Sequence, residues 1–103
     1  MKDVIDIINQ LAQLELRIKG TADEGACERN FSRIKESLKN MGYDYKLPLY
    51  EKYAETSTDL EATITGTNTE NLIIKNIVKP IIYRDNKLEQ KGIVMVEAAN
   101  ENH

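Results

Sequence analysis

"IVKPIIYRDNKLEQKGIVMVE", residues 77–97, is the stretch of sequence that decides the fold. Apolar residues recur on both sides of Asp85 and Asn86, two residue types that tolerate the backbone geometry of a tight turn. Pro80 cannot donate to a strand ladder, so it marks the entry to a β-hairpin. Gly92 marks a position where another stretch of backbone is expected to approach closely. The stretch therefore predicts a closing hairpin whose second arm is "LEQKGIVMVE", residues 88–97.

Three more segments before this hairpin read as strands. In "YDYKLPLY", residues 43–50, apolar and polar side chains alternate, and Pro48 favours an edge or an extended arm. "LEATITG", residues 60–66, alternates in the same way and predicts a half-buried strand. "LIIKNIV", residues 72–78, predicts a strand that ends or bends at Pro80. The second half of the chain is therefore expected to be a small all-β domain.

The first 42 residues have helical periodicity instead. A first apolar stripe repeats at steps of three and four, with Ile8 widening it, Asp3 as the expected N-cap and Gly20 following the helix. Thr21 and Glu24 predict a capping box for a second helix, which Gly42 ends. The stripe of that helix consists of Cys27, Phe31, Ile34, Leu38 and Met41. The chain is thus expected to be α+β, with a two-helix segment at 1–42, a β-domain at 43–99 and a disordered tail at 100–103.

Two amphipathic helices alone leave apolar surface in water, so a further layer must cover them. A homodimer in which each copy gives two helices to a four-helix bundle is the simplest source of that layer. Packing against the chain's own C-terminal half is the alternative. The dimer interface expected from the two stripes consists of Val4, Ile7, Leu11, Leu14, Ile18, Phe31, Ile34 and Leu38.

Composition narrows the class of protein. The 103 residues fit one domain, and the net charge of −3 comes without a basic face, which disfavours a nucleic-acid partner. A single cysteine excludes an internal disulfide and fits a reducing compartment. No segment approaches the ~20 apolar residues that span a bilayer, and the N-terminus does not resemble a secretory signal. The sequence predicts a cytoplasmic protein without a membrane partner.

Side chains suited to catalysis are scarce. The single histidine is His103, the last residue, and Cys27 lies on an apolar helical stripe, where a core role is the more frequent one. Glutamates of the second helix alternate with Arg and Lys, as on a solvated face. The glycines are scattered and form no phosphate-binding loop. We therefore expect that the protein is not an enzyme and that it has no metal site and no cofactor.

Residues 77–97 also resemble the final β-hairpin of the GrpE family, the nucleotide exchange factors of DnaK-type chaperones. The resemblance rests on "VKPIIY", residues 78–83, and on Leu88, Gln90, Gly92, Val94 and Val96 of "LEQKGIVMV". The two short helices ahead of a β-domain also match the family, whose members dimerise through a helical stalk and a four-helix bundle. Two family features are missing: the Asp-Pro…His-Glu-Ala signature and the long N-terminal stalk helix.

The resemblance implies a function without covalent chemistry, in which the β-domain docks on the chaperone's ATPase domain and promotes ADP release. Lys87 matches a basic position that contacts the chaperone, and Val78 and Val96 match apolar positions near that contact surface. The plain alternatives are a solvated turn lysine and two core valines. The alternative function is a small homodimeric adaptor or regulatory protein that binds another protein on a GrpE-like scaffold. An RNA-binding β-domain is disfavoured by the balanced charge and by Tyr83 being the one aromatic among the basic strand residues.

Overall fold

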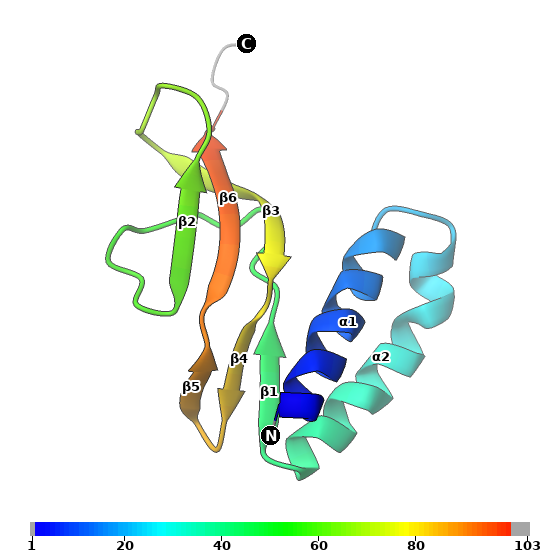
Figure 1. Ribbon diagram of the computed structural model, residues 1–103. Coiled ribbons are helices and arrows are strands. Elements are labelled where there is room, and N and C mark those ends of the chain that lie inside the picture. Colours follow the sequence, from blue (N-terminus) through cyan, green and yellow to red (C-terminus); the bar gives the residue numbers. More distant parts are fainter. Residues whose placement is uncertain (1, 100–103) are drawn as a thin grey trace.

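A computed structural model describes residues 2–99 and has the expected α+β architecture, two helices followed by six strands (Figure 1). The expected tail at 100–103, with His103, lies outside the described residues. The elements are α1 (Lys2–Ile18), α2 (Asp23–Asn40), β1 (Tyr43–Lys46), β2 (Leu60–Ile64), β3 (Leu72–Lys79), β4 (Ile81–Arg84), β5 (Lys87–Gln90) and β6 (Gly92–Ala98). No helix among residues 2–99 is both long and apolar enough to span a bilayer.

The strands form two three-stranded sheets that are joined end to end. One sheet has the order β1-β4-β5, with β4 antiparallel to both neighbours. The other has the order β2-β6-β3, with β6 parallel to β2 and antiparallel to β3. The chain passes from β3 to β4 through Pro80 and from β5 to β6 through Lys91, so two strands cross between the sheets side by side (Figure 1).

This crossing corrects the predicted closing hairpin. Residues 88–97 are not one arm: β5 pairs with β4 in one sheet, whereas β6 is the central strand of the other. The chain changes sheets at Gly92, where a Cβ atom would lie 2.8 Å from Ile81 Cγ1 and 2.9 Å from Leu60 Cδ2. The close approach at Gly92 is thus present, but side chains make it: the nearest backbone atom to this Cβ position is Ile81 N, at 3.4 Å. The Gln90 side-chain amide donates to the Pro80 carbonyl at 3.0 Å and ties the two crossings together.

The turn between β4 and β5 is the one that the sequence predicts. Asp85 and Asn86 have φ angles of 52° and 67°, the left-handed values that both central residues of a type I′ turn require. Aspartate and asparagine adopt such values more readily than other residues with a side chain, because their short polar groups bond locally.

The helix ends agree with the sequence in part. Gly20 and Gly42 follow the helices with φ angles of 80° and 91°, as expected for residues after a helix. The predicted capping box is shifted, because the Glu24 carboxylate accepts from the Gly20 backbone amide at 2.9 Å and not from that of Thr21. The expected N-cap Asp3 lies inside the first turn of α1. Its negative charge there interacts favourably with the positive end of the helix dipole.

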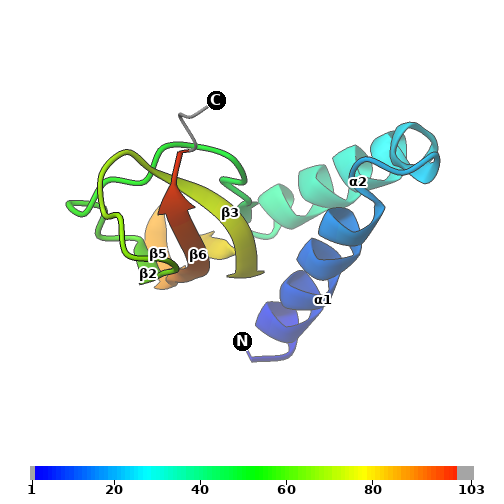
Figure 2. The same ribbon diagram turned by 90° about the horizontal axis from the view of Figure 1, so that it is seen from above.

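Two apolar cores hold the molecule together. The first lies between the helices and the β1-β4-β5 sheet and consists of Ile8, Leu38, Tyr43, Tyr45 and Ile82. The second lies against the β2-β6-β3 sheet and consists of Leu72, Ile74, Ile77, Val94 and Val96. The helical segment therefore packs on the chain's own β-part, which is the alternative that the sequence left open. Figure 2 shows both helices on one side of the strands.

The buried face of α1 is rotated from the predicted stripe. Its most buried residues are Ile8 and Ala12, with exposed fractions of 0% and 1%. Ile7 and Leu14, which the predicted stripe includes, are 56% and 50% exposed. The rotation arises because α1 packs on a sheet, whereas the predicted stripe is the face that would pack against other helices. Part of the apolar surface of α1 therefore remains open.

Candidate protein-binding surfaces

Lys87 lies at the end of the molecule formed by the β4–β5 turn, and its side chain is exposed. The turn is held from behind: the Asp85 backbone amide donates to the Gly42 carbonyl at 2.8 Å. Residue 42 has a φ angle of 91°, which favours glycine, and a Cβ atom there would force the Asp85 carboxylate to move. The end of α2 thus supports the turn, and Lys87 projects from a fixed base.

Val78 and Val96, the other two residues singled out by the resemblance, lie in opposite environments. Val78 is 48% exposed on β3 and lines an open groove with Gln13 and Arg17 of α1. Val96 is 0% exposed, belongs to the second core and pairs with Ile74 across the sheet. Of the three residues, Lys87 and Val78 are therefore accessible to a partner, whereas Val96 packs inside the β-part.

The eight residues expected at a dimer interface also separate into groups. Leu38 is 8% exposed and belongs to the first core. Val4, Leu11 and Ile34 pack partly against that core, and Ile18 and Phe31 are half-buried. Ile7 and Leu14 remain open. The helical residues that a second copy could cover most readily are thus the two on the outward side of α1.

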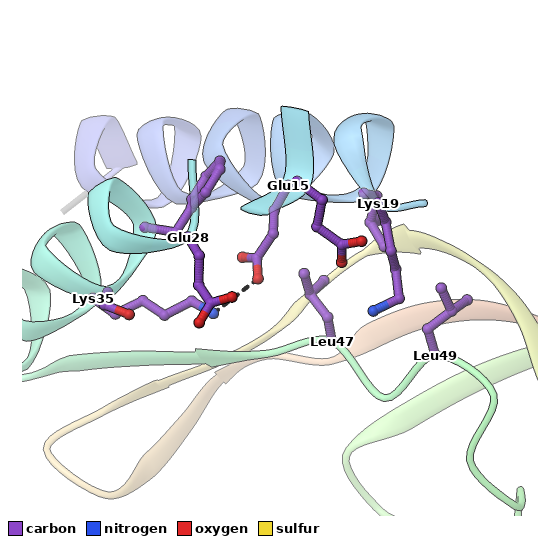
Figure 3. A pocket seen from close by; sticks show the side chains of 10 residues that line it. Glu15, Lys19, Glu28, Lys35, Leu47 and Leu49 are labelled. Atoms are coloured by element: carbon purple, nitrogen blue, oxygen red, sulfur yellow. Dashed lines mark hydrogen bonds and ion pairs between the residues drawn. The ribbon is translucent and has the colours of Figure 1, made fainter. Parts of the chain in front are cut away.

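A cavity of about 280 Å³ separates the two helices from the segment after β1 (Figure 3). Its wall carries apolar side chains, Leu16 and Phe31 from the helices and Leu47 and Leu49 from the segment. Its rim carries charges of both signs: Glu15, Lys19, Glu24, Glu28 and Lys35. The sequence did not predict this cavity, because the charged residues of α2 read as an ordinary solvated face.

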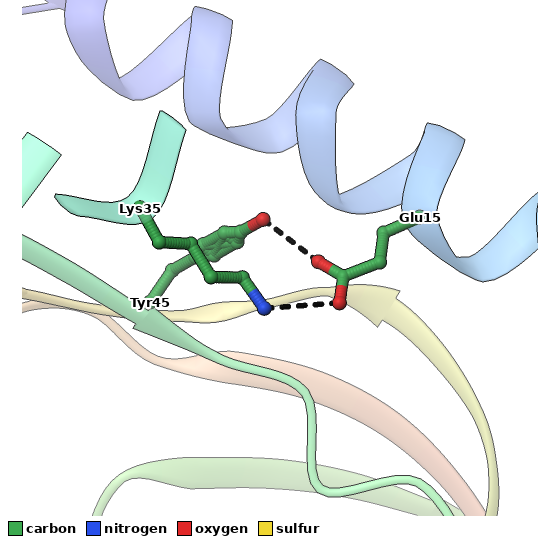
Figure 4. A network of polar contacts seen from close by, with 3 residues as sticks. All are labelled: Glu15, Lys35 and Tyr45. Carbon is green, nitrogen blue, oxygen red and sulfur yellow. Dashed lines mark hydrogen bonds and ion pairs between the residues drawn. The ribbon is translucent and has the colours of Figure 1, made fainter. Parts of the chain in front are cut away.

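Three polar side chains join α1, α2 and β1 at the edge of this cavity (Figure 4). The Tyr45 hydroxyl donates to Glu15 Oε1 at 2.8 Å, and Lys35 Nζ lies 3.0 Å from Glu15 Oε2. Lys35 Nζ also lies 5.2 Å from the centroid of the Tyr45 ring, within the range of a cation–π contact. Burial, the hydrogen bond to Glu15 and the negative charge of Glu15 raise the pKa of Tyr45 above 10.0. The network holds the helices on the sheet.

A second polar cluster lies on the other face of the β1-β4-β5 sheet. The Tyr83 hydroxyl donates to Asp59 Oδ2 at 3.0 Å, and Lys46 Nζ lies 5.6 Å from the Tyr83 ring centroid. Partial desolvation and the Asp59 carboxylate raise the pKa of Tyr83. The contact fixes the loop before β2 on β4. Tyr83 is therefore engaged within its own chain and does not present a free ring for base stacking.

A third contact was also missed by sequence reasoning. The side-chain amides of Asn9 and Gln90 bond reciprocally, with distances of 3.2 Å and 2.9 Å, and link α1 to β5. The one sign of this contact in the sequence was that Asn9, a polar residue, stands next to the apolar Ile8. Its partner could not be found, because the two residues are far apart in the sequence.

The described part of the chain offers few groups for covalent chemistry. Among residues 2–99, no three His, Cys, Asp or Glu side chains lie close enough together to hold a metal ion. Cys27 is a half-buried free thiol on α2. The surfaces with distinctive character are thus the turn at Lys87, the groove at Val78, the cavity beside Glu15 and the outward side of α1.

No protein-family description, curated protein sequence or solved structure matches this chain.

Proposed function

We propose that the protein is a GrpE-like co-chaperone that docks on the ATPase domain of a DnaK-type chaperone and promotes ADP release. The observation that carries the proposal is the position of Lys87. The resemblance assigns this lysine to the contact, and the lysine projects from a turn that α2 supports. Val78 is accessible on β3, the strand that leads to the β4–β5 hairpin. Six residues of extended chain separate Val78 from Arg84 at the end of β4, a distance of roughly 20 Å.

The mechanism needs binding energy alone and no cofactor. A protein that prefers the open form of the nucleotide cleft weakens ADP binding by linkage, and each tenfold weakening requires about 1.4 kcal/mol of preference. A rigid docking surface supplies such a preference without paying for ordering. The β-part meets this condition, because the chain joins its two sheets directly at Pro80 and again at Lys91. The partner is intracellular, so the proposal includes a cytoplasmic location.

Release of fluorescent ADP from a DnaK-type chaperone tests the proposal. The protein should accelerate release, and Lys87→Glu should weaken the effect roughly tenfold because it reverses a charge at the contact. Lys75→Glu is the matched control, since Lys75 is an exposed lysine on β3 and the substitution changes the net charge equally. Absence of both acceleration and a complex on a sizing column would overturn the proposal.

The proposed function includes a homodimer. Its support is the apolar surface that the chain's own sheet leaves open, Ile7 and Leu14 at 56% and 50% exposure. The two residues are seven apart on α1 and so share one face. Burying two such side chains favours association with another apolar helix face. Light scattering at micromolar concentration and above tests the mass.

An adaptor or regulatory protein on the same scaffold is the second candidate. The observation that favours it is the cavity between the helices and the segment after β1, which lies apart from Lys87 and offers another binding surface. An adaptor would keep the dimer and bind a protein other than a chaperone. Capture of a specific non-chaperone partner, lost on Phe31→Glu and retained on Lys87→Glu, would favour this candidate.

A further inference from the structure

Five exposed residues form a stripe along the outward side of α1, and we call them the outer stripe. They are Asp3, Ile7, Gln10, Leu14 and Arg17, spaced by four, three, four and three residues. This spacing places them on one helix face. The face is opposite Ile8 and Ala12, the two buried residues of α1, with exposed fractions of 0% and 1%. The outer stripe is therefore the side of α1 that faces away from the first core, and its Arg17 end borders the groove beside Val78 of β3.

The charged ends of the outer stripe have no ion-pair partner of their own. Among residues 2–99 the salt bridge joins Lys35 to Glu15, and neither Asp3 nor Arg17 takes part in an ion pair. Each does suit its end of the helix dipole, with acid in the first turn and base in the last. That placement stabilises the helix but leaves the apolar residues between the charges unexplained.

The order of residues along the outer stripe is self-complementary. From either end it runs charge, apolar, amide, apolar, charge, with Gln10 at the midpoint and opposite signs at the two ends. A two-fold axis through Gln10 places Asp3 of one copy against Arg17 of the other, and Ile7 within one residue of Leu14. A parallel arrangement would instead place Asp3 against Asp3 and Arg17 against Arg17. The charges thus select the antiparallel arrangement.

We propose that a second copy of the chain binds the outer stripe, with the two α1 helices antiparallel about Gln10. The inference rests on the homodimer proposed above, and it adds the helix and its direction. The stripe spans about 21 Å, from 14 residues at 1.5 Å each, so the interface is narrow and the dimer weak. The β-parts then lie on opposite sides of the helix pair, each with its Lys87 turn free.

Cysteine cross-linking tests the geometry. With Cys27 replaced by alanine, Gln10→Cys should form an intermolecular disulfide under mild oxidation, because residue 10 lies on the axis. Asp3→Cys should not, because its two copies lie about 21 Å apart along the helices. Efficient cross-linking of Asp3→Cys as well as Gln10→Cys indicates a parallel pair, and no cross-linking of Gln10→Cys shows that residue 10 is not on the axis. Either result overturns the proposal.

A charge exchange tests the same pairing without oxidation. Asp3→Arg and Arg17→Asp each turn both ion pairs into repulsions and should weaken self-association roughly tenfold. An equal mixture of the two variants restores both attractions and should form heterodimers about as tight as the original dimer. Thermal unfolding of each variant separates the loss of helix stability from the loss of association. A mixture no tighter than either variant overturns the proposal.

The outcomes also separate this inference from the proposed function. A chain that accelerates ADP release yet sediments as a monomer up to millimolar concentration overturns the antiparallel dimer and leaves the exchange function standing. A chain that dimerises through Gln10 without accelerating ADP release supports the dimer and removes the exchange function.

Discussion

At the scale of single residues, Gly25 and Gly92 stand in opposite environments. A Cβ atom at Gly25 in α2 meets no atom within 4 Å, whereas one at Gly92 meets the Ile81 and Leu60 side chains at 2.8 Å and 2.9 Å. Gly25 is the third residue of α2, and a glycine held in a helix loses more backbone entropy on folding than alanine does. The glycine at 92 has a packing reason, and the glycine at 25 has none in this structure.

Replacing each glycine by alanine should therefore shift stability in opposite directions. Gly92→Ala should lower the free energy of unfolding by about 1–3 kcal/mol, because the added methyl group displaces two core side chains. Gly25→Ala should raise it by about 0.5–1 kcal/mol. Urea denaturation measures both. Equal stability of the two variants would contradict the sheet-to-sheet crossing at residue 92.

At the scale of elements, the helices are held on β1 by a hydrogen bond to a carboxylate. Tyr45→Phe keeps the buried ring and removes the bond to Glu15, which should cost about 1 kcal/mol and about 4–8 °C in Tm. The value is modest because the side chain of Glu15 is 28% exposed. Tyr50→Phe is the control, since Tyr50 is 63% exposed, and its Tm should not change.

The same bond makes stability depend on alkaline pH. Because the pKa of Tyr45 is raised in the folded state, the folded protein keeps a proton that the unfolded chain loses above its ordinary pKa of 10.0. The contribution is thus complete below about pH 10 and declines as pH rises further. Tyr45→Phe should flatten this decline. Tyr83, whose pKa is also raised, should account for part of the remaining slope.

The sequence predicted the helices, most strand positions and the turn at Asp85–Asn86, because each follows from local periodicity or turn chemistry. It did not predict that residues 88–97 divide between two sheets, since the pattern of alternation continues across Gly92. Nor did it predict the Glu15–Lys35–Tyr45 network, whose members come from three elements. Nor did it predict which face of α1 is buried. That face depends on the surface against which the helix packs, and α1 packs on a sheet rather than on other helices.

The exposed Lys87 illustrates the same limit at the surface. Its place in a turn follows from the neighbouring Asp85 and Asn86, but the support from Gly42 joins residues that are far apart in the chain. The burial of Val96 likewise depends on β6 being the central strand of its sheet.

At the scale of the whole molecule, the chain joins the two sheets directly at Pro80 and at Lys91, so we expect one cooperative unfolding transition. Ile8→Val in the first core and Ile74→Val in the second should each lower stability by about 1 kcal/mol. Far-ultraviolet circular dichroism and tyrosine fluorescence should report the same midpoint in both variants. A shift of the helical signal alone in Ile8→Val would show that the helices unfold separately.

The central place of β6 has a consequence for the making of the protein. Both neighbours of β6, β2 and β3, precede it in the chain and pair with it rather than with each other. During synthesis they leave the ribosome first, and the edge of each that faces β6 stays unpaired until residues 92–98 follow. The apolar run of β3 is exposed throughout that interval, which makes the nascent chain prone to aggregate. A chain ended before residue 92 should therefore aggregate more than one ended after residue 98, because only the shorter chain leaves the edges of β2 and β3 that face β6 unpaired.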